Sequence, residues 1–325
     1  MRAVVHRAFG PPDVLNVEEV PTPTPRSDEL LIRVHAATVT AVDGAARRGE
    51  PLPARLAFGP FRPKYPTLGA DCAGRVEAVG EDVRDFAPGD EVVALSPRFG
   101  THAEYVCVPQ DAPVVAKSSA LTHAETVAVS EGALTALPFL RDAARLRPGR
   151  SILVNGASGS IGSAAVQLAA HMGVEVTAVC SGGNADLVRS LGAHRVIDHT
   201  AEDFTEAREA YDVVFDAVGK SSFGRCRRAL KVGGHYLTTV SSMAIMGQTM
   251  WTRLGRKRAS IALTGLRPAP DKARDLVLIR GLAEAGTIRA VIDRSYPLDR
   301  AVEAHGYVDA GHKKGAVVMR MSGED

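Results

Sequence analysis

Residues 155–162, with the sequence NGASGSIG, form a glycine-rich turn whose spacing is typical of a pyrophosphate-binding site. A short apolar segment, 151–154, precedes the turn, and an amphipathic run to Met172 follows it. In such a turn the first glycine permits a tight bend, the second lets a phosphate approach the backbone, and the third lets helix and strand pack closely. The helix N-terminus would add unpaired N–H groups and a positive dipole. The pattern predicts a dinucleotide site made of Gly156, Ala157, Ser158, Gly159, Ser160, Ile161 and Gly162.

The end of the next predicted strand, 174–180, indicates which dinucleotide would bind. Folds that bind NAD usually end this strand with an acidic residue that holds the ribose hydroxyls. Here the strand runs into Ser181-Gly182-Gly183-Asn184, which carries no acid. Because no carboxylate would repel a 2′-phosphate, we expect NADPH rather than NADH. The polar side chains available to that phosphate are Ser181, Asn184, His199 and Lys314.

Two different residue patterns along the chain predict the elements that must position these residues. Residues 1 to about 120 contain short alternating segments separated by turn signals, which predicts a β-rich, barrel-like domain. A helix start at Thr122 opens a region, to about residue 265, in which strands and helices alternate. Continuously apolar strands joined by helices predict a parallel sheet covered on both faces. The predicted strands include 30–36, 74–80, 90–95, 151–155, 174–180, 195–198, 211–216, 234–240, 260–266 and 315–321, and the predicted helices include 160–172, 185–191, 221–230 and 271–285.

Composition limits the partners and the compartment. A formal net charge of +2 gives no reason to expect nucleic acid, and the basic run 253–258 is more typical of a solvated face than of a phosphate site. The four cysteines contain no C-x-x-C pair, which indicates a reducing compartment. The first residues alternate like a strand rather than a targeting segment, and no apolar run is long enough to cross a membrane. We therefore expect a cytoplasmic protein with a small-molecule substrate and no membrane partner.

Several stretches in order along the chain resemble the medium-chain dehydrogenase/reductase superfamily, on its zinc-free quinone oxidoreductase (zeta-crystallin-like) branch. These stretches are LGADCAGRVEAVG (68–80), FAPGDEVVAL (86–95), GTHAEYVCVP (100–109), LTAL (134–137), NGASGSIGSAAVQLA (155–169), YDVVFDAVG (211–219) and YPLDRAVEAHGYVDAGHKKGAVVM (296–319). The resemblance implies an α/β protein with a GroES-like β-barrel catalytic domain and a doubly wound parallel-sheet Rossmann domain. It places the first at 1–121, completed by 267–325, and the second at 122–266. It also implies a homodimer joined through the Rossmann sheet edges, and Thr135, Val218 and Val240 would frame the nicotinamide ribose.

The resemblance raises the question of zinc, because related alcohol dehydrogenases depend on it. A catalytic zinc needs about three ligands of the Cys, His or carboxylate type. This chain has Thr40 where zinc-dependent relatives carry a cysteine, and Ala70 where they carry a histidine. The four-cysteine structural lobe of those relatives is also missing. We therefore expect no bound metal.

A reductase without zinc favours acceptors that delocalise the arriving charge themselves, such as quinones and α,β-unsaturated carbonyls. Thr40 and Asp43 match the polar pair of the quinone reductase pocket, and Thr40 could orient the substrate or relay a proton through water. The alternative is that Thr40 caps a turn and Asp43 starts a helix. The predicted function is thus an NADPH-dependent quinone or enone reductase. The rivals are an NAD(P)-dependent alcohol dehydrogenase and a catalytically silent nucleotide-binding protein. The segment 241–266 could cap the substrate cleft or pack at a subunit edge.

Overall fold

The computed structural model describes residues 1–50, 55, 58–262 and 264–321. They form two units, Met1–Glu131 with Pro268–Asp325, and Gly132–Arg267. The chain passes from the first unit to the second within α3 (His123–Pro138) and returns just before α8 (Ala269–Glu284). The boundary predicted after residue 121 lies at the start of α3. The change in composition on which that prediction rests marks where this helix begins, whereas the chain enters the second unit further along the same helix.

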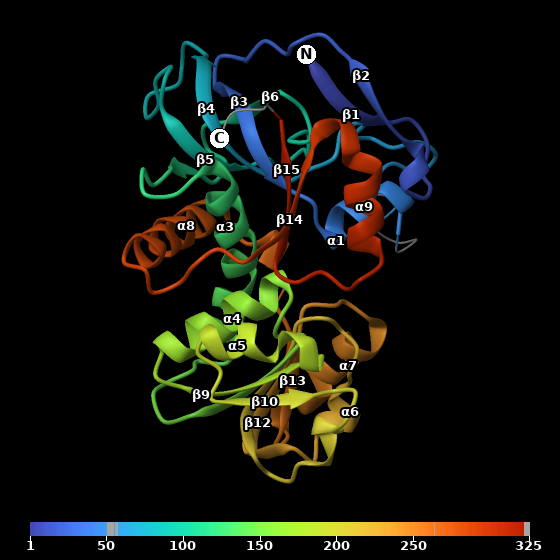
Figure 1. The fold of residues 1–325 in the computed structure, drawn as a ribbon, viewed down its shortest axis with the longest axis vertical. Coiled ribbons are helices and arrows are strands. Elements are labelled where there is room, and N and C mark those ends of the chain that lie inside the picture. The colour runs from blue at the N-terminus through green and yellow to red at the C-terminus, as the bar shows by residue number, and fades with distance from the viewer. Residues whose placement is uncertain (51–54, 56–57, 263, 322–325) are drawn as a thin grey trace. The chain divides into compact units, whose positions relative to one another are not determined.

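The first unit is built on a seven-stranded sheet in the order β14-β15-β3-β4-β5-β7, with β6 pairing β3 (Figure 1). Its strand pairs are antiparallel except for β14 with β15, and β1 and β2 form a separate antiparallel pair. The C-terminal strand β15 pairs with β3, so the last part of the chain extends the N-terminal sheet. The elements are β1 (Arg2–His6), β2 (Leu15–Glu19), β3 (Glu29–Thr38), α1 (Ala41–Arg48), β4 (Asp71–Val79), β5 (Glu91–Leu95), β6 (Tyr105–Pro109), β7 (Val114–Ala116), β14 (Ile292–Pro297), α9 (Ala301–Asp309) and β15 (Ala316–Arg320).

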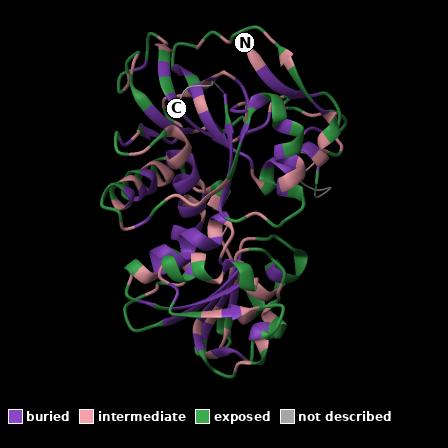
Figure 2. Ribbon diagram, viewed as in Figure 1, coloured by how far each residue is buried: buried purple, intermediate pink, exposed green. Residues whose placement is uncertain are grey.

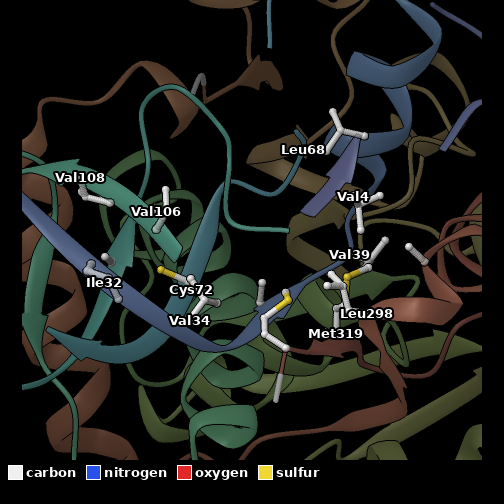
Figure 3. Packing of buried hydrophobic residues seen from close by; sticks show 14 of the residues in the cluster. Val4, Ile32, Val34, Val39, Leu68, Cys72, Val106, Val108, Leu298 and Met319 are labelled. Atoms are coloured by element: carbon white, nitrogen blue, oxygen red, sulfur yellow. The ribbon is translucent and has the colours of Figure 1, made fainter. Parts of the chain in front are cut away.

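Valine and isoleucine side chains from several of these strands form the core of the first unit. Figure 3 shows Ile32 and Val34 of β3 beside Val106 and Val108 of β6, with Cys72 of β4 next to them. All five side chains are buried. Each fully buried valine or isoleucine contributes about 1.5–3 kcal/mol relative to leaving it in water. Thr38 and Asp71, which matter below, lie at strand ends at the margin of this core.

The second unit is built on a six-stranded parallel sheet in the order β10-β9-β8-β11-β12-β13. Figure 1 shows α4 and α5 together on one side of this sheet and α6 and α7 on the other. Every residue of β8 is buried, as expected for a strand covered on both faces. The predicted α/β architecture is therefore confirmed. The elements are β8 (Ser151–Asn155), α4 (Ser160–His171), β9 (Glu175–Cys180), α5 (Ala185–Ser190), β10 (Arg195–Asp198), β11 (Tyr211–Asp216), α6 (Phe223–Cys226), β12 (Leu230–Thr238), α7 (Met243–Trp251) and β13 (Arg258–Ile261).

Two predicted elements of this unit were wrong in extent. The helix predicted over 221–230 is only the single turn α6, because β12 already begins at Leu230. The strand predicted over 260–266 is β13, which ends at Ile261, and a 3₁₀ turn occupies Thr264–Leu266. Residue 263 of that prediction lies outside the described residues. Across the described ranges, no helix has both the length and the apolar character that crossing a bilayer requires.

Candidate functional site

The carboxyl ends of β8, β11 and β12 lie side by side in the second unit. Asp216 at the end of β11 is in register with Asn155 of β8 and with Thr238 of β12. The loops that follow are held together, since a Cβ on Gly156 would overlap Val218 and a Cβ on Gly219 would overlap Val240. Open α/β sheets bind their ligands outside these strand ends. The structure therefore brings the predicted residues Gly156, Val218 and Val240 together where a dinucleotide would bind.

The three glycines of the turn are required for different reasons. Gly156 has a φ of +78°, and a Cβ on Gly162 would overlap the Gly156 carbonyl oxygen and lie 2.8 Å from the Ala157 Cα atom. A Cβ on Gly159, in contrast, would meet only that same carbonyl oxygen, at an ordinary 3.5 Å. The chain itself thus requires the first and third glycines but leaves open space at the second. This is the arrangement expected where an external phosphate approaches the backbone.

Gly159 is also the N-cap residue of α4, and no side chain caps this helix end. Within the described part of the chain, the backbone N–H groups of Ile161 and Gly162 have no hydrogen-bond acceptor. Such N–H groups, together with the positive end of the helix dipole, favour an anion. The predicted residues Ala157, Ser158 and Ser160 lie on the same turn, where Ala157 and Ser160 are buried and Ser158 is half-buried.

Asp216 organises the loops at this edge, and the sequence-based prediction missed it. Its carboxylate is fully buried and accepts five hydrogen bonds. The donors come from β8, β12 and the loop after β11: Asn155 Nδ2 at 3.0 Å, Tyr236 Oη at 3.0 Å, and the N–H groups of Val218, Gly219 and Ser221 at 3.3, 2.9 and 2.9 Å. Burial, followed by the Asp216 charge, raises the pKa of the Tyr236 hydroxyl far above its usual value, so this hydroxyl remains a donor. The motif YDVVFDAVG contains the residue but gives no sign that these donors converge on it.

Asn184 connects the glycine turn to the end of β9. It is buried, and its Nδ2 donates to Ser158 Oγ at 3.1 Å and to Ser181 Oγ at 3.2 Å. Its amide nitrogen is therefore engaged within the protein. His199 is exposed just beyond β10, and its N–H donates to the Cys180 carbonyl oxygen at 3.2 Å.

Asp198 places a carboxylate at the same edge, from the strand beside β9. It is in register with Cys180, and a Cβ on Gly182 would overlap its Oδ2 atom. Its Oδ1 accepts hydrogen bonds from the N–H and the hydroxyl of Thr200, which lower the pKa of the carboxyl group. β9 does not end in an acidic residue, but Asp198 places one at the end of the neighbouring strand β10. Its carboxyl group already accepts hydrogen bonds from Thr200.

The remaining two predicted cofactor residues lie on other elements. Thr135 is half-buried on α3, one turn after Gly132. A Cβ added to Gly132 would lie 2.5 Å from the Ser160 carbonyl oxygen. This close packing places α3 against the start of α4. Lys314 belongs to the first unit, where it is exposed on the turn before β15 and its N–H donates to Asp293 Oδ2 at 2.7 Å.

A cavity of about 300 Å³ lies at the opposite, amino-terminal edge of the same sheet. It is lined by Asp142, Arg145, Arg150, Asp212, His235 and Arg258, among others. Burial and the nearby Arg258 lower the pKa of His235 to about 4. Because ligands of such folds bind at the carboxyl ends of the strands, this cavity is not the dinucleotide site.

Thr40 and Asp43 form a capping box at the start of α1. The Thr40 hydroxyl donates to Asp43 Oδ2 at 2.7 Å and accepts from the Asp43 N–H, while the Thr40 N–H donates to Asp43 Oδ2 at 2.8 Å. Asp43 is fully buried, and its Oδ1 accepts the Gly69 N–H at 2.9 Å. The structure thus shows the helix-capping role that the sequence left as an alternative. The box also fixes the residues that lead into β4.

Asp71 is a buried carboxyl group two residues after Gly69. Its Oδ1 accepts hydrogen bonds from the Thr38 N–H at 3.1 Å and the Thr38 hydroxyl at 2.7 Å. Among the described residues, its buried Oδ2 has no hydrogen-bond partner. Burial raises the pKa of Asp71 to about 7, and the negative charges of Glu131 and Asp43 add to the rise against the lowering effect of Thr38. This carboxyl group is therefore partly protonated near neutral pH.

The titration of Asp71 predicts a pH-dependent contribution to stability. Its pKa is near 4 in the unfolded chain and about 7 when folded, so the folded state holds the proton more tightly. This contribution is complete below about pH 4 and is lost as the pH rises through about 7. In Asp71→Asn, whose side-chain oxygen can still accept from Thr38, we expect the free energy of unfolding relative to wild type to rise between these pH values and then to level off. Urea denaturation at a series of pH values measures it, and a difference that stays constant with pH would contradict the assignment.

The side chains of this region do not fit a zinc ion. The Thr40 hydroxyl is engaged with Asp43, and Ala70 offers only a methyl group. Across the described ranges, no three His, Cys, Asp or Glu side chains gather as a metal site. Since a catalytic zinc needs about three such ligands, we derive no step through this metal.

Comparisons with known proteins agree with this geometry. Residues 26–120 match the family model of the alcohol dehydrogenase GroES-like domain, and residues 191–319 match a model described as zinc-binding dehydrogenase. The chain is 33% identical to a mitochondrial NAD(P)H oxidoreductase of Mus musculus, over 90% of this chain and 82% of that protein. It is 31% identical to a chloroplastic NADPH-dependent alkenal/one oxidoreductase of Arabidopsis thaliana, over 98% of this chain and 79% of that protein.

A solved structure is similar over almost the whole length. The quinone oxidoreductase from Coxiella burnetii is 28% identical, superposes with a TM-score of 0.89, and covers 99% of each chain. The likeness to this structure extends over the fold of the whole chain. The chain therefore belongs to the medium-chain dehydrogenase/reductase superfamily, in its quinone oxidoreductase branch, and is an oxidoreductase of the quinone or enone reductase type.

Proposed function

We propose that this oxidoreductase is an NADPH-dependent, zinc-independent enzyme that reduces a quinone or an α,β-unsaturated carbonyl compound. The observation that carries the proposal is the open backbone at Gly159, between two glycines that the chain itself requires. The relatives named as a quinone oxidoreductase and an NADPH-dependent alkenal/one oxidoreductase support the same substrate classes. NADPH, when bound, supplies the hydride.

Each group at the carboxyl edge has a proposed role in holding the cofactor. The turn from Gly156 to Gly162 would bind the pyrophosphate, and Val218, Val240 and Thr135 would frame the nicotinamide ribose. Ser181 and His199 are the proposed contacts of the 2′-phosphate, and Lys314, which belongs to the other unit, stays an expectation from the sequence. We assign Asn184 to bracing Ser158 and Ser181, because its amide nitrogen already donates to both. Since Asp198 is held by Thr200, we expect the dissociation constant of NADPH to stay below that of NADH.

The acceptor follows from the residues that surround Thr40. Among the described residues, no three His, Cys, Asp or Glu side chains gather to hold the Lewis-acidic metal that would stabilise the alkoxide of an isolated ketone. A quinone or enone spreads the negative charge over its own conjugated system and then takes a proton. We propose Thr40 and Asp43 as positioning residues, because the Thr40 hydroxyl proton is donated to Asp43 and the other Asp43 oxygen holds Gly69.

We also propose that the protein forms a homodimer through β13. This strand is one end of the six-stranded sheet, so its outer backbone groups are available for pairing with a second copy. A two-fold axis through this edge would join two sheets of the same kind. Sedimentation velocity of the purified protein measures the oligomeric state.

Turnover with defined acceptors tests the proposed reaction. We expect loss of the nicotinamide absorbance when NADPH is mixed with 1,4-naphthoquinone or a 2-enone, and much slower loss with a saturated ketone of the same size. The same assay with NADH gives the cofactor preference. A broad panel of quinones and enones without turnover, from protein that binds NADPH in calorimetry, would overturn the substrate class.

Two substitutions at Thr40 separate capping from substrate contact. Asparagine caps helices as well as threonine does, whereas alanine costs about 1 kcal/mol at this position. If Thr40 only positions α1, Thr40→Asn should keep both the melting temperature and kcat/KM within about two-fold, and Thr40→Ala should lower the melting temperature. If its hydroxyl touches the substrate, Thr40→Asn will lose kcat/KM as Thr40→Ala does while remaining stable.

A further inference from the structure

The cavity at the amino-terminal edge of the six-stranded sheet has no part in the reaction proposed above. Its volume of about 300 Å³ is at the lower end of the range of small-molecule sites. Three arginines line it: Arg145, Arg150 and Arg258. Figure 2 shows the strands of this sheet as largely buried, while Arg145 and Arg150 are exposed on the connection from α3 to β8. A hollow lined by arginines is a candidate site for an anion.

The two carboxylates that line the cavity are already neutralised by other side chains. Asp212 accepts hydrogen bonds from Arg150 Nη1 at 2.9 Å and from Lys231 Nζ at 2.9 Å. Asp142 accepts the Nε–H of the arginine that precedes it at 2.7 Å. The single negative charge of Asp212 thus faces two cations, and Arg145 has no ion-pair partner among the described residues. An excess of positive charge therefore surrounds the cavity.

Arg145 is held in a backbone conformation that an arginine rarely adopts. Its φ is +50°, in the left-handed region. One turn of π-helix, Phe139–Ala143, comes just before it, and the Ala144 N–H donates to the Phe139 carbonyl oxygen at 2.8 Å. Both features cost free energy and are frequent at functional sites. The fold therefore retains a strained turn at the place where Arg145 lines the cavity.

His235 on β12 attaches this turn to the sheet. Its ring donates a hydrogen bond to the Ala143 carbonyl oxygen, and its Nε2 lies 2.8 Å from the Ser260 hydroxyl oxygen. Because the pKa of His235 is lowered to about 4, the ring is neutral at pH 7 and its Nε2 accepts from that hydroxyl. These two contacts join the turn before β8 to β12. The wall of the cavity that carries Arg145 is therefore preformed.

We infer that this cavity is a binding site for a phosphate group, carried by a small phosphomonoester or present as the free ion. A phosphate presents several acceptor oxygens that point in different directions, so it can bind arginines that approach from different places. Arg145 follows the π-helical turn and Arg150 directly precedes β8, and both line the cavity. A planar carboxylate, in contrast, is satisfied by the fork of one arginine. The arrangement therefore favours phosphate.

This site is separate from the edge of the sheet at which we propose that NADPH binds. Asp212 lies near the start of β11 and Asp216 at its end, four residues later. At about 3.3 Å per residue, the two carboxylates are about 13 Å apart along the strand. A phosphate group beside Asp212 therefore does not reach the loops that Asp216 holds. The ligand is a second one, and the inference does not depend on the proposed reaction.

The arginines that carry the inference lie away from the sheet edge through which we propose the dimer. Arg150 directly precedes β8 and pairs with Asp212 of β11, and β12 separates both of these strands from β13. Arg258 is the first residue of β13, so we assign it no part in binding. The protein is assayed as it assembles in solution. A cavity covered by a second copy would then bind nothing, and the proposal would fail.

Calorimetric titration of the full-length protein tests the site at low ionic strength, where exposed charges are least screened. The probes are inorganic phosphate and glycerol 3-phosphate, with glycerol as the uncharged control. We expect saturable binding of at least one phosphate probe and none of glycerol, and the tighter probe identifies the source of the phosphate group. The titration is repeated with NADPH present. Saturable binding of neither probe, or binding that NADPH abolishes, would overturn the proposal.

Two variants of the same connection assign the binding to the cavity. Arg145→Gln should raise the dissociation constant of the tighter probe at least about ten-fold, because a hydrogen bond to a charged group is lost. Arg147→Gln removes the same charge from an exposed side chain that does not line the cavity, so the constant should change less than about two-fold. Among the described residues neither arginine has an ion-pair partner, so both variants should keep the wild-type melting temperature. Equal weakening in the two variants would indicate a diffuse attraction to positive charge and overturn the assignment.

Discussion

Replacing Gly159 by alanine should leave the protein folded and raise the dissociation constant of NADPH at least about ten-fold, a change of about 1.4 kcal/mol. A methyl group at this position meets no atom of the chain closer than 3.5 Å. It would, however, occupy the space through which a pyrophosphate reaches the start of α4. Because alanine is a poorer N-cap residue than glycine, the free energy of unfolding should fall by no more than about 1 kcal/mol. Calorimetric titration with NADPH and urea denaturation measure the two effects.

Gly162→Ala provides the contrasting result. Its methyl group would overlap the Gly156 carbonyl oxygen and lie 2.8 Å from the Ala157 Cα atom, so backbone must move. We expect this variant to lose several kcal/mol of stability together with NADPH binding. The pair therefore separates a glycine needed by the ligand from a glycine needed by the fold. Wild-type affinity for NADPH in Gly159→Ala would show that the pyrophosphate does not approach this turn.

The glycine turn could be predicted from sequence because all of its signals are local. An apolar segment, three glycines at equal spacing and an amphipathic run follow one another within 151–172, and the structure places β8 and α4 there to within one residue. The alternation of strands and helices likewise predicted the parallel sheet. The same local reasoning left Thr40 and Asp43 with two roles. Only the geometry showed that both side chains take part in a capping box.

The roles of Asp216 and Asp71 could not be predicted, because their partners are distant in sequence. Asp216 receives hydrogen bonds from Asn155, 61 residues earlier, and from Tyr236, 20 residues later. Asp71 is bound by Thr38 only because β3 pairs with β4. In a sequence each of them is one acidic residue at the margin of an apolar strand. Its function depends on which strands become neighbours in the sheet.

The segment 241–266 shows a different limit of sequence analysis. Its methionines and Trp251 fit a cap over a cleft, a subunit edge or an ordinary core helix equally well. The pattern within α7 predicts a helix but does not say which face is covered. The structure adds that Ile245 alone of this helix is buried and that Met243, Met246 and Met250 are exposed.

Asp216→Ala should lower the free energy of unfolding by about 3–5 kcal/mol and abolish NADPH binding at concentrations that saturate the wild type. Five donors converge on this carboxylate, and each buried donor left without an acceptor costs about 1–3 kcal/mol, which water entering the cavity would partly offset. Asp216→Asn retains one acceptor but directs an NH₂ group at donors. It should bind NADPH more weakly than wild type while losing less stability than the alanine variant. Urea denaturation and calorimetry measure both quantities.

Asp212 gives a matched control for Asp216, because it is the same residue type at the other end of β11. It is partly buried, and hydrogen bonds from Lys231, Ser151 and Arg150 outweigh that burial and hold the pKa of its carboxyl group at about 2. Asp212→Asn should therefore lower stability as well. It lies at the amino-terminal edge of the sheet, so the dissociation constant of NADPH should not change. If the two asparagine variants weakened NADPH binding equally, the effect would come from general loss of stability; a loss confined to Asp216→Asn would locate the cofactor at the loops that Asp216 holds.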